Sequence, residues 1–247
     1  MTPKNLAIAR SCRVLSRLLD YPSDALFAAL PELMQVLRQE AALSGARLAE
    51  LEGLVLHLAR GDRFQRQAEY VETFDRGRAT SLHLFEHVHG DSRDRGPALV
   101  DLARTYEAGG LYFDGHVRPQ DTEPTTDGPA FTRELPDYVP VVLEFASLQP
   151  PATARAFLAE MAHILNALHA ALLQREQPYA AVLGAVLELA GETPRPVPVT
   201  ADEPLDQAWV EPAAFDGCSS RGQSRPDAVQ PIHIVKRGPD AAQGVRP

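Results

Sequence analysis

The chain contains little cysteine, few aromatic residues and no long apolar run. Only 2 of its 247 residues are cysteine, Cys12 and Cys218, and they lie far apart in the sequence. A disulfide framework is therefore excluded, and so is a zinc or iron–sulfur site built from cysteines alone. The longest nearly apolar run, residues 180–190, is far shorter than the ~20 residues that a membrane-spanning helix needs.

The N-terminal segment and the net charge argue against further classes of protein. Arg10, Arg13 and Arg17 interrupt every apolar stretch near the start, which is not the pattern of a secretory signal peptide. Asp and Glu outnumber Lys and Arg by 33 to 24, so the formal net charge is -9. Tight binding to nucleic acid or to an anionic membrane is not expected with this charge. We therefore expect a soluble, cytoplasmic protein without nucleic-acid partners or direct membrane insertion.

The spacing of apolar residues predicts an all-α fold. Through residues 5–190 these residues recur at intervals of three and four, and no comparable run alternates with period two. Tyr21 and Pro22 are expected to end the first helix, and Ser23 to cap the second. Pro31 is expected to break that helix or to start another. Gly191 is the expected C-terminal cap of the last helix.

Three of the predicted apolar stripes show which residues we expect to pack in the core. The fourth helix is predicted to bury one stripe, which comprises Phe64, Ala68, Val71 and Phe74. The sixth stripe begins at Leu135 and continues through Ala146. The longest stripe, from Phe157 to Leu172, predicts one continuous helix.

Proline content indicates a boundary near residue 191. Nine of the 21 prolines lie in residues 192–247, which show no helical period. We predict one helical-bundle domain over residues 1–191 and a Pro-rich, mostly disordered tail over residues 192–247. Trp209 and Phe215 are unusual in such a tail; they either pack back onto the domain or form a recognition segment that folds on a partner. Residues 113–133 are a second irregular stretch, of a length that is usually functional or mobile.

The densest group of functional side chains lies between residues 70 and 96. His83, Glu86 and His87 match the H-x-x-E-H pattern of inverted zinc peptidases. In that interpretation both histidines bind Zn²⁺ from one helical face and the glutamate is a general base. The alternative is that His87 hydrogen-bonds a turn while His83 is half-exposed.

Arginine and carboxylate side chains are interspersed in the same stretch. The residues concerned are Arg76, Arg78, Arg93, Arg95, Asp75, Glu86, Asp91 and Asp94. We favour a partly buried lattice that holds the irregular connection rigid over a solvated run of charges. Asp91 or Ser92 is expected to cap a helix that starts near Arg93, with Pro97 in its first turn.

Residues 134–140 are predicted to begin the next helix. Pro136 and Asp137 would occupy its first turn, where a missing N–H costs nothing and a carboxylate is favoured. One interpretation is that these residues cap the helix and do nothing else. The other is that a helix start carrying the carboxylates of Glu134 and Asp137 receives a cationic or donor-rich peptide.

Four stretches of the sequence together carry a family resemblance. The longest is YVETFDRGRATSLHLFEHVHGDSRDRGPALVDLARTYEAGGL, and RVLSRLLDYP, ELPDYVPVVLEF and AWVEPAAFDGC accompany it. In this order they resemble NarJ-type nitrate reductase assembly chaperones, from about residue 5 to 218. The wider superfamily is that of the TorD/DmsD redox-enzyme maturation proteins, whose E-P-x-D-H motif resembles Glu134, Pro136, Asp137 and Tyr138. Here Leu135 displaces the proline by one place and Tyr138 replaces the histidine.

The resemblance implies a single all-α domain of the TorD type and a set of signature residues. These residues would bind a client peptide or maintain the structure around its site. They are Tyr70, Phe74, Asp75, Arg78, Ser81, Leu82, His83, Glu86, His87, His89, Gly90, Asp91, Ser92, Arg93, Arg95, Glu134, Pro136, Asp137 and Tyr138.

The resemblance also implies a chaperone and not an enzyme. Such chaperones bind the apo catalytic (alpha) subunit of respiratory nitrate reductase in the cytoplasm, and they take up its N-terminal peptide as a helix in a groove. They support insertion of the molybdenum cofactor and delay membrane docking until the complex is assembled. Proteins of molybdenum cofactor biosynthesis are further partners that the resemblance allows.

No cofactor is expected on the chain itself. The molybdenum bis(molybdopterin guanine dinucleotide) and the iron–sulfur clusters would belong to the client. The sequence contains no nucleophile elbow, phosphate loop or dinucleotide fingerprint. Two alternative functions are kept open: a zinc-dependent hydrolase through His83, Glu86 and His87, and a nucleotide-binding regulator.

Overall fold

The computed structural model describes residues 7–90, 92–113, 130–132 and 134–197. Within these residues the chain forms ten α-helices, one 3₁₀ turn and two short strands, so the predicted all-α class is confirmed. Trp209, Phe215, the rest of the tail beyond residue 197 and most of residues 113–133 lie outside the described residues. The elements are α1 (Ala7–Leu19), α2 (Asp24–Glu40), α3 (Gly45–Ala59), α4 (Arg63–Phe74), η2 (Arg78–Thr80), α5 (Leu84–His89), α6 (Arg95–Ala108), β1 (Leu111–Phe113), β2 (Ala130–Thr132), α7 (Val139–Leu148), α8 (Pro151–Glu160), α9 (Ala162–Gln174) and α10 (Ala180–Ala190).

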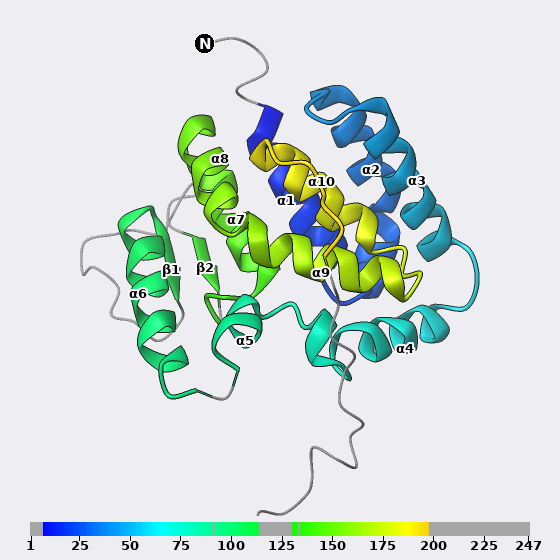
Figure 1. The fold of residues 1–247 in the computed structure, drawn as a ribbon. Coiled ribbons are helices and arrows are strands. Elements are labelled where there is room, and N and C mark those ends of the chain that lie inside the picture. The colour runs from blue at the N-terminus through cyan, green and yellow to red at the C-terminus, as the bar shows by residue number, and fades with distance from the viewer. Residues whose placement is uncertain (1–6, 91, 114–129, 133, 198–247) are drawn as a thin grey trace, which may run out of the picture. The chain divides into compact units, whose positions relative to one another are not determined.

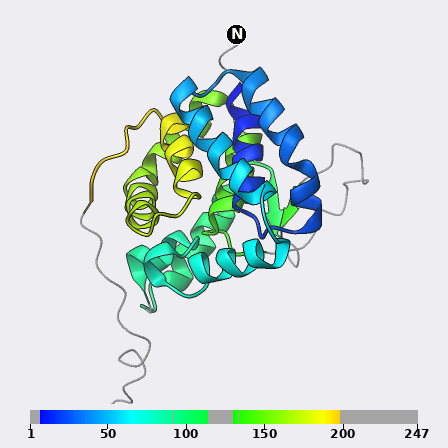
Figure 2. The same cartoon turned by 90° about the vertical axis from the view of Figure 1, so that its right-hand side faces the viewer.

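Helix α1 lies in the middle of the bundle. It packs against α2, α7, α8 and α10, and Figure 1 shows α2 and α3 on one side of it and α7 and α8 on the other. Leu15, Leu18 and Leu19 on its apolar stripe are completely buried. Each such side chain contributes about 2 kcal/mol through its removal from water. Helix α4 crosses the lower end of the bundle in both views (Figures 1 and 2).

Helix α2 is continuous through Pro31, so the predicted break is wrong. Ser23 caps its N-terminus as expected, because its side-chain oxygen accepts a hydrogen bond from the N–H of Leu26. Leu30 and Met34 are buried on the core-facing side of the helix, before and after the proline. This packing on both sides of Pro31 compensates for the one helical hydrogen bond that proline cannot make.

Helix α4 forms where predicted, but it buries a different face. Phe64 is 81% exposed, and Ala68 is exposed as well. The buried residues of α4 are Arg66, Tyr70, Thr73 and Phe74. The predicted apolar stripe is therefore wrong for Phe64 and Ala68 and correct for Phe74, and Val71 is half-buried. An arginine and a threonine take core positions because their polar atoms find partners there: Arg66 bonds to His57 and pairs with Glu69, and Thr73 bonds to Gln177.

The long helix predicted over residues 157–172 is two helices. Helices α8 and α9 meet at Met161 with a bend of 65°. The break lets α9 pack on α10 while α8 also packs on α7, which one straight helix could not do. No single helix in the described residues is long and apolar enough to cross a membrane.

A small second core lies beside the main one. Tyr106, Leu111, Val141 and Phe145 form it, where α6 and β1 meet α7. Strands β1 and β2 pair in parallel with Leu111 opposite Ala130. Strands of three residues are too short to show an alternating pattern, which explains why the sequence did not reveal them. Gly109 ends α6 directly before β1.

Candidate functional site

A backbone bridge joins residues 82–84 to residues 137–139, two segments that both contain signature residues. The N–H of Leu84 donates to the carbonyl of Asp137 at 2.9 Å, and the N–H of Val139 donates to the carbonyl of Leu82 at 2.9 Å. His83 and Tyr138 are thereby antiparallel bridge partners, and their rings lie 5.2 Å apart. The structure therefore brings residues 81–86 and 134–139 together although more than 45 residues separate them in sequence.

The buried carboxylate of Asp137 is the centre of this junction. Its side chain is 0% exposed. Oδ2 accepts hydrogen bonds from the N–H of Phe85 at 3.1 Å and from Arg95 at 3.3 Å. Oδ1 accepts from Nδ1 of His83 at 3.3 Å. Burial alone would raise the pKa of Asp137, but the hydrogen bond and charge of His83, the Phe85 amide and Arg95 hold it below the usual carboxyl value.

Arg95 extends this network to Glu86 and Ser81. Arg95 donates to Oε1 of Glu86 at 3.1 Å, and the Ser81 hydroxyl donates to Oε2 at 2.6 Å. Nε2 of His87 donates to the carbonyl of Ser81 at 2.8 Å. The expected arginine–carboxylate lattice thus exists around Arg95 and holds the connection between α4 and α6. Arg93, in contrast, is exposed, and Arg76 pairs with Glu72 on the surface.

Both predicted helix starts in this region are displaced. Helix α6 begins at Arg95 with Asp94 as its N-cap, and the side chain of Ser92 accepts from the N–H of Asp94 at 3.2 Å. Pro97 lies in its first turn as expected, and Asp91 lies outside the described residues.

Helix α7 begins at Val139, so Asp137 lies before the helix. Pro140, and not Pro136, occupies the first turn of α7. The carboxylate of Asp137 instead accepts from the start of α5, across the junction. Because Asp137 is fully buried, the interpretation in which it meets a cationic peptide at a helix start is wrong.

The H-x-x-E-H pattern does not place its histidines together on one helix. His83 is the N-cap of α5 and turns its ring to Asp137, whereas His87 turns its ring to the Ser81 carbonyl. Both carboxylate oxygens of Glu86 accept hydrogen bonds, one from Ser81 and one from Arg95. No group of three or more metal-binding side chains exists among the described residues. No described residue arrangement thus supports a zinc hydrolase.

Tyr70 and Phe74 belong to an aromatic cluster in the core. The rings of Tyr21, Phe74 and Tyr179 all lie within 6 Å of the Tyr70 ring. The Tyr70 hydroxyl donates to the carbonyl of Leu19 at 2.7 Å and lies 3.2 Å from the Tyr138 hydroxyl. Burial, followed by the neighbouring tyrosines, raises the pKa of Tyr70. These two signature residues therefore anchor α4 to the end of α1.

A groove between α1 and α7 opens beside Tyr138. Its cavity has a volume of about 310 Å³. Apolar atoms of Pro140, Val141 and Leu148 line it together with polar groups from both helices. The polar lining residues are Arg13, Ser16, Arg17, Asp20, Glu134, Tyr138 and Glu144. We call this feature the α1–α7 groove.

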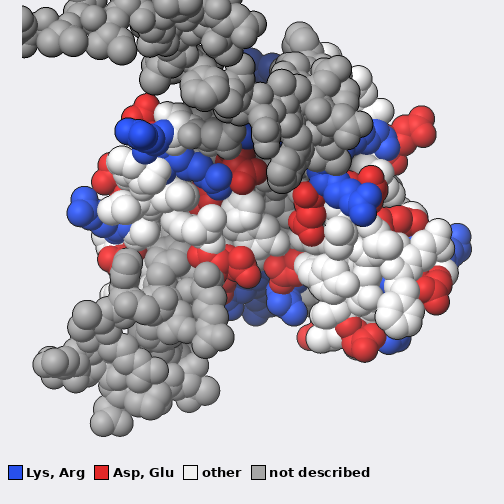
Figure 3. All heavy atoms as spheres, turned by 90° about the horizontal axis from the view of Figure 1, so that it is seen from below, with Lys and Arg blue, Asp and Glu red and all other residues white. Residues whose placement is uncertain are grey.

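Three carboxylates of the α1–α7 groove, those of Asp20, Glu134 and Glu144, lie close enough to influence one another. Burial raises the pKa of Asp20 and Arg17 lowers it, while the charges of Glu144 and Glu134 raise it further. Arg17 pairs with Asp20 at 2.8 Å, and Arg13 donates to the Ser147 hydroxyl at 3.2 Å. Three carboxylates close to one another favour the approach of a cationic group. On the underside of the molecule, acidic and basic side chains lie side by side, without an extended field of one sign on the described surface (Figure 3).

Only a minority of the signature residues line the α1–α7 groove. Glu134 and Tyr138 do, whereas Ser81, Leu82, Pro136 and Asp137 are buried behind them. Asp75, Arg78, His89, Gly90, Ser92 and Arg93 lie on the connection around η2 and α5. The sequence reasoning missed Asp20 and Glu144. No local pattern in the sequence signals these two residues, because only the packing of α1 on α7 brings them to one groove.

Comparison with known proteins agrees with the family resemblance that the sequence shows. The family described as "Nitrate reductase delta subunit" matches residues 39–184, well over half of the chain. The probable nitrate reductase molybdenum cofactor assembly chaperone NarW of Escherichia coli K12 is 36% identical over 81% of this chain and 80% of its own. The corresponding chaperone NarJ of the same strain is 38% identical over 80% of this chain and 81% of its own. A probable NarJ of Bacillus subtilis 168 is 30% identical over 70% of this chain and 84% of its own.

These relatives are described as assembly chaperones and not as enzymes, in agreement with the prediction of a non-enzymatic protein. The residues that match the family, 39–184, include the Asp137 junction. The chain belongs to the nitrate reductase delta subunit family, as a NarJ-type molybdenum cofactor assembly chaperone.

Proposed function

We propose that this protein binds the apo catalytic subunit of respiratory nitrate reductase through its N-terminal peptide. Binding supports insertion of the molybdenum cofactor and precedes docking of the complex to the membrane. The protein acts in the cytoplasm, and its helical domain, residues 1–191, carries the binding site. The molybdenum cofactor and the iron–sulfur clusters belong to the client, and proteins of molybdenum cofactor biosynthesis are further partners.

The α1–α7 groove is the observation that carries this proposal. It combines an apolar floor with the carboxylates of Asp20, Glu134 and Glu144. A helical peptide can lay its apolar face on such a floor and place basic side chains beside the carboxylates. Tyr21 and Leu135, which follow Asp20 and Glu134 in sequence, are about half exposed and extend the apolar surface at this end. The lining holds these three carboxylates and two arginines, Arg13 and Arg17, so an acidic excess of one charge and the apolar floor favour a basic amphipathic peptide.

The Asp137 junction gives the signature residues a role in this function. Tyr138 caps the N-terminus of α7 and lines the groove, and the bridge to His83 fixes its backbone. The hydroxyl of Tyr70 fixes its side chain from the other direction. Tyr70 and His83 therefore position Tyr138, and Glu134 and Tyr138 are the signature residues that line the groove.

Electrostatics makes the proposed binding dependent on pH and salt. A cationic side chain near Asp20 favours the ionised carboxylate, which burial and the neighbouring carboxylates disfavour in the free protein. Affinity for a basic peptide should therefore fall as the pH is lowered through the raised pKa of Asp20. It should also fall with added salt, because the groove is partly open to water.

Capture of the client from cells tests the proposed function. The tagged full chain, expressed in cells that make nitrate reductase without molybdenum cofactor, should retain the catalytic subunit. A client lacking its N-terminal peptide should not be retained. Equal recovery of both forms would contradict the role of the peptide, and absence of the catalytic subunit would contradict the function itself.

A further inference from the structure

The last described residues cross α9 and occupy its surface. After α10 the chain turns back and runs over α9 (Figure 1), and we call residues 192–197 the strap. The side chain of Asn166 on α9 forms two hydrogen bonds with the backbone of Arg195. Nδ2 donates to its carbonyl at 2.9 Å, and Oδ1 accepts from its N–H at 2.7 Å. Asn166 thus pairs with a peptide backbone much as a neighbouring β-strand would.

The strap is held by little else. Pro194 and Pro196 have no N–H to donate, and in the described residues the Asn166 pair is the hydrogen bonding that ties residues 193–197 to α9. The Arg195 side chain is 77% exposed. Gly191, which joins the strap to α10, has φ +85 and open space around it, so the strap starts at a residue that can act as a hinge. A segment with this anchoring can leave the surface without unfolding the helical domain.

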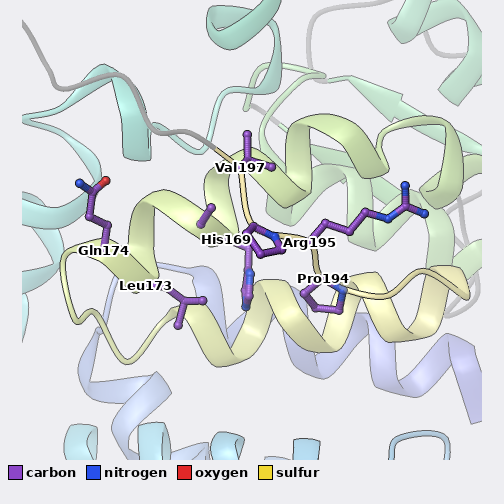
Figure 4. Close-up of a pocket in the computed structure, with 8 residues that line it drawn as sticks. His169, Leu173, Gln174, Pro194, Arg195 and Val197 are labelled. Carbon is purple, nitrogen blue, oxygen red and sulfur yellow. The ribbon is translucent and has the colours of Figure 1, made fainter.

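The surface under the strap is an open, mostly apolar cavity. Its volume is about 490 Å³, and it is lined by four residues of α9 and by residues 194–197 of the strap (Figure 4). The α9 residues are His169, Ala170, Leu173 and Gln174. Leu173 is 57% exposed there. His169 is buried, and burial followed by the charge of Arg47 lowers its pKa. None of the α9 residues that line the cavity is an Asp, Glu, Lys or Arg.

The side chains of the strap show which kind of segment fits this surface. Pro194 and Val197 are half-buried, whereas Arg195 and Pro196 are exposed. Residues three apart lie on one face of a polyproline II helix, which has three residues per turn. A suitable occupant is an extended, proline-containing segment with apolar residues at positions i and i+3 and a free N–H between them.

We propose that α9 carries a second client-binding surface, which the strap occupies in the free protein. A proline-containing extended segment of the client displaces the strap, pairs its backbone with Asn166 and covers Leu173. This inference rests on the proposed chaperone function, but it concerns a different surface from the α1–α7 groove. The strap would then lower the apparent affinity for the client by the fraction of molecules in which it is closed.

Substitution of Arg195 separates the backbone contact from the side chain. In the full chain, Arg195→Pro removes the N–H that Asn166 accepts and should release the strap. Arg195→Ala keeps that N–H and serves as the matched control. Because the side chain is mostly exposed, both variants should fold with an unchanged melting temperature, which is measured first.

A synthetic peptide of sequence ETPRPVPV, equal to residues 192–199, tests the surface without any client. With Arg195→Pro, added peptide should produce saturable NMR shifts of the Leu173 methyl groups and the His169 ring. Wild type and Arg195→Ala should show clearly smaller shifts at the same peptide concentration. Adding Asn166→Ala to Arg195→Pro should abolish the response. Equal responses in all variants, or none in Arg195→Pro, would overturn the proposal.

The apo catalytic subunit then tests whether the client uses this surface. Arg195→Pro should bind it about fivefold or more tightly than wild type, with Arg195→Ala unchanged. Equal affinities of all three proteins, together with a positive peptide response, would overturn the client role of α9. If wild type and variants all fail to bind the catalytic subunit, the chaperone function fails, while the peptide experiment still decides whether the surface exists.

Discussion

The carboxylate of Asp137 accepts a hydrogen bond at 3.1 Å from the backbone N–H of Phe85, a residue 52 positions earlier in the chain. This contact attaches the first turn of α5 to the segment that leads into α7. The carboxylate also binds His83 and Arg95, so one buried anion joins three parts of the signature. The junction in turn fixes Tyr138 at the end of the α1–α7 groove.

Removal of this carboxylate should cost much of the stability of the domain. Asp137→Ala leaves the His83 ring, the Arg95 guanidinium and the Phe85 amide without their buried acceptor. We expect a loss of about 3 kcal/mol or more in the free energy of unfolding, measured by urea denaturation. Asp137→Asn keeps one oxygen acceptor and should lose less. A change within experimental error for Asp137→Ala would contradict the role of the junction.

The pKa values of His83 and His169 should be shifted in opposite directions from the ordinary histidine value. The hydrogen bond that His83 donates to Asp137 raises the pKa of His83 above 6.5, whereas burial lowers that of His169 below it. NMR titration of the ring protons measures both values. If His83 titrates at or below the ordinary histidine value in the wild-type protein, its pairing with Asp137 is wrong.

The paired side chains of His83 and Asp137 predict how the stability of the protein depends on pH. Because the pKa of His83 is raised, its contribution is full below the ordinary histidine value and is lost as the pH rises through its folded pKa. Because the pKa of Asp137 is lowered, its contribution is present above the ordinary carboxyl value and is lost as the pH falls through its folded pKa. The stabilisation from this pair should therefore be greatest in mildly acidic solution, and His83→Ala should flatten the pH profile.

Two glycine substitutions should have opposite effects on stability. A methyl group at Gly109 would overlap the buried ring of Phe145, so Gly109→Ala should destabilise the protein by about 1–3 kcal/mol. Gly53 lies within α3 with nothing near its added methyl, so Gly53→Ala should stabilise by up to about 1 kcal/mol. Thermal unfolding of both variants distinguishes the signs. Equal effects would argue against the packing of Gly109 on Phe145.

The sequence was a good guide to the helices and to most of the faces they bury, but not to the buried face of α4. Helical period and capping residues located α1, α2 and α10 because these signals are local. The buried face of α4 depends on polar partners, His57 on α3 for Arg66 and the distant Gln177 for Thr73, so a hydrophobic pattern could not reveal it. The break at Met161 is set by packing on α10 and α7 in the same way.

The candidate site shows the same division between local and distant information. The density of charged residues in residues 70–96 correctly indicated a partly buried lattice around Arg95. Its most important partner, Asp137, is predicted from the sequence in the first turn of a helix, either as a cap or as part of a peptide-binding helix start, because the pairing with His83 and Arg95 is not visible locally. Asp20 and Glu144 join Glu134 only through the packing of α1 on α7, which no local pattern shows.

Calorimetry with the N-terminal peptide of the nitrate reductase catalytic subunit tests the central claim most directly. At low salt the wild-type chain should bind the peptide, and Glu144→Lys in the α1–α7 groove should weaken binding about tenfold or more through charge repulsion. Glu32→Lys, an exposed charge reversal on α2 outside the groove, is the matched control and should bind like wild type. Absence of wild-type binding would contradict the claim that the protein recognises this peptide. Equal weakening by both variants would contradict the assignment of the groove.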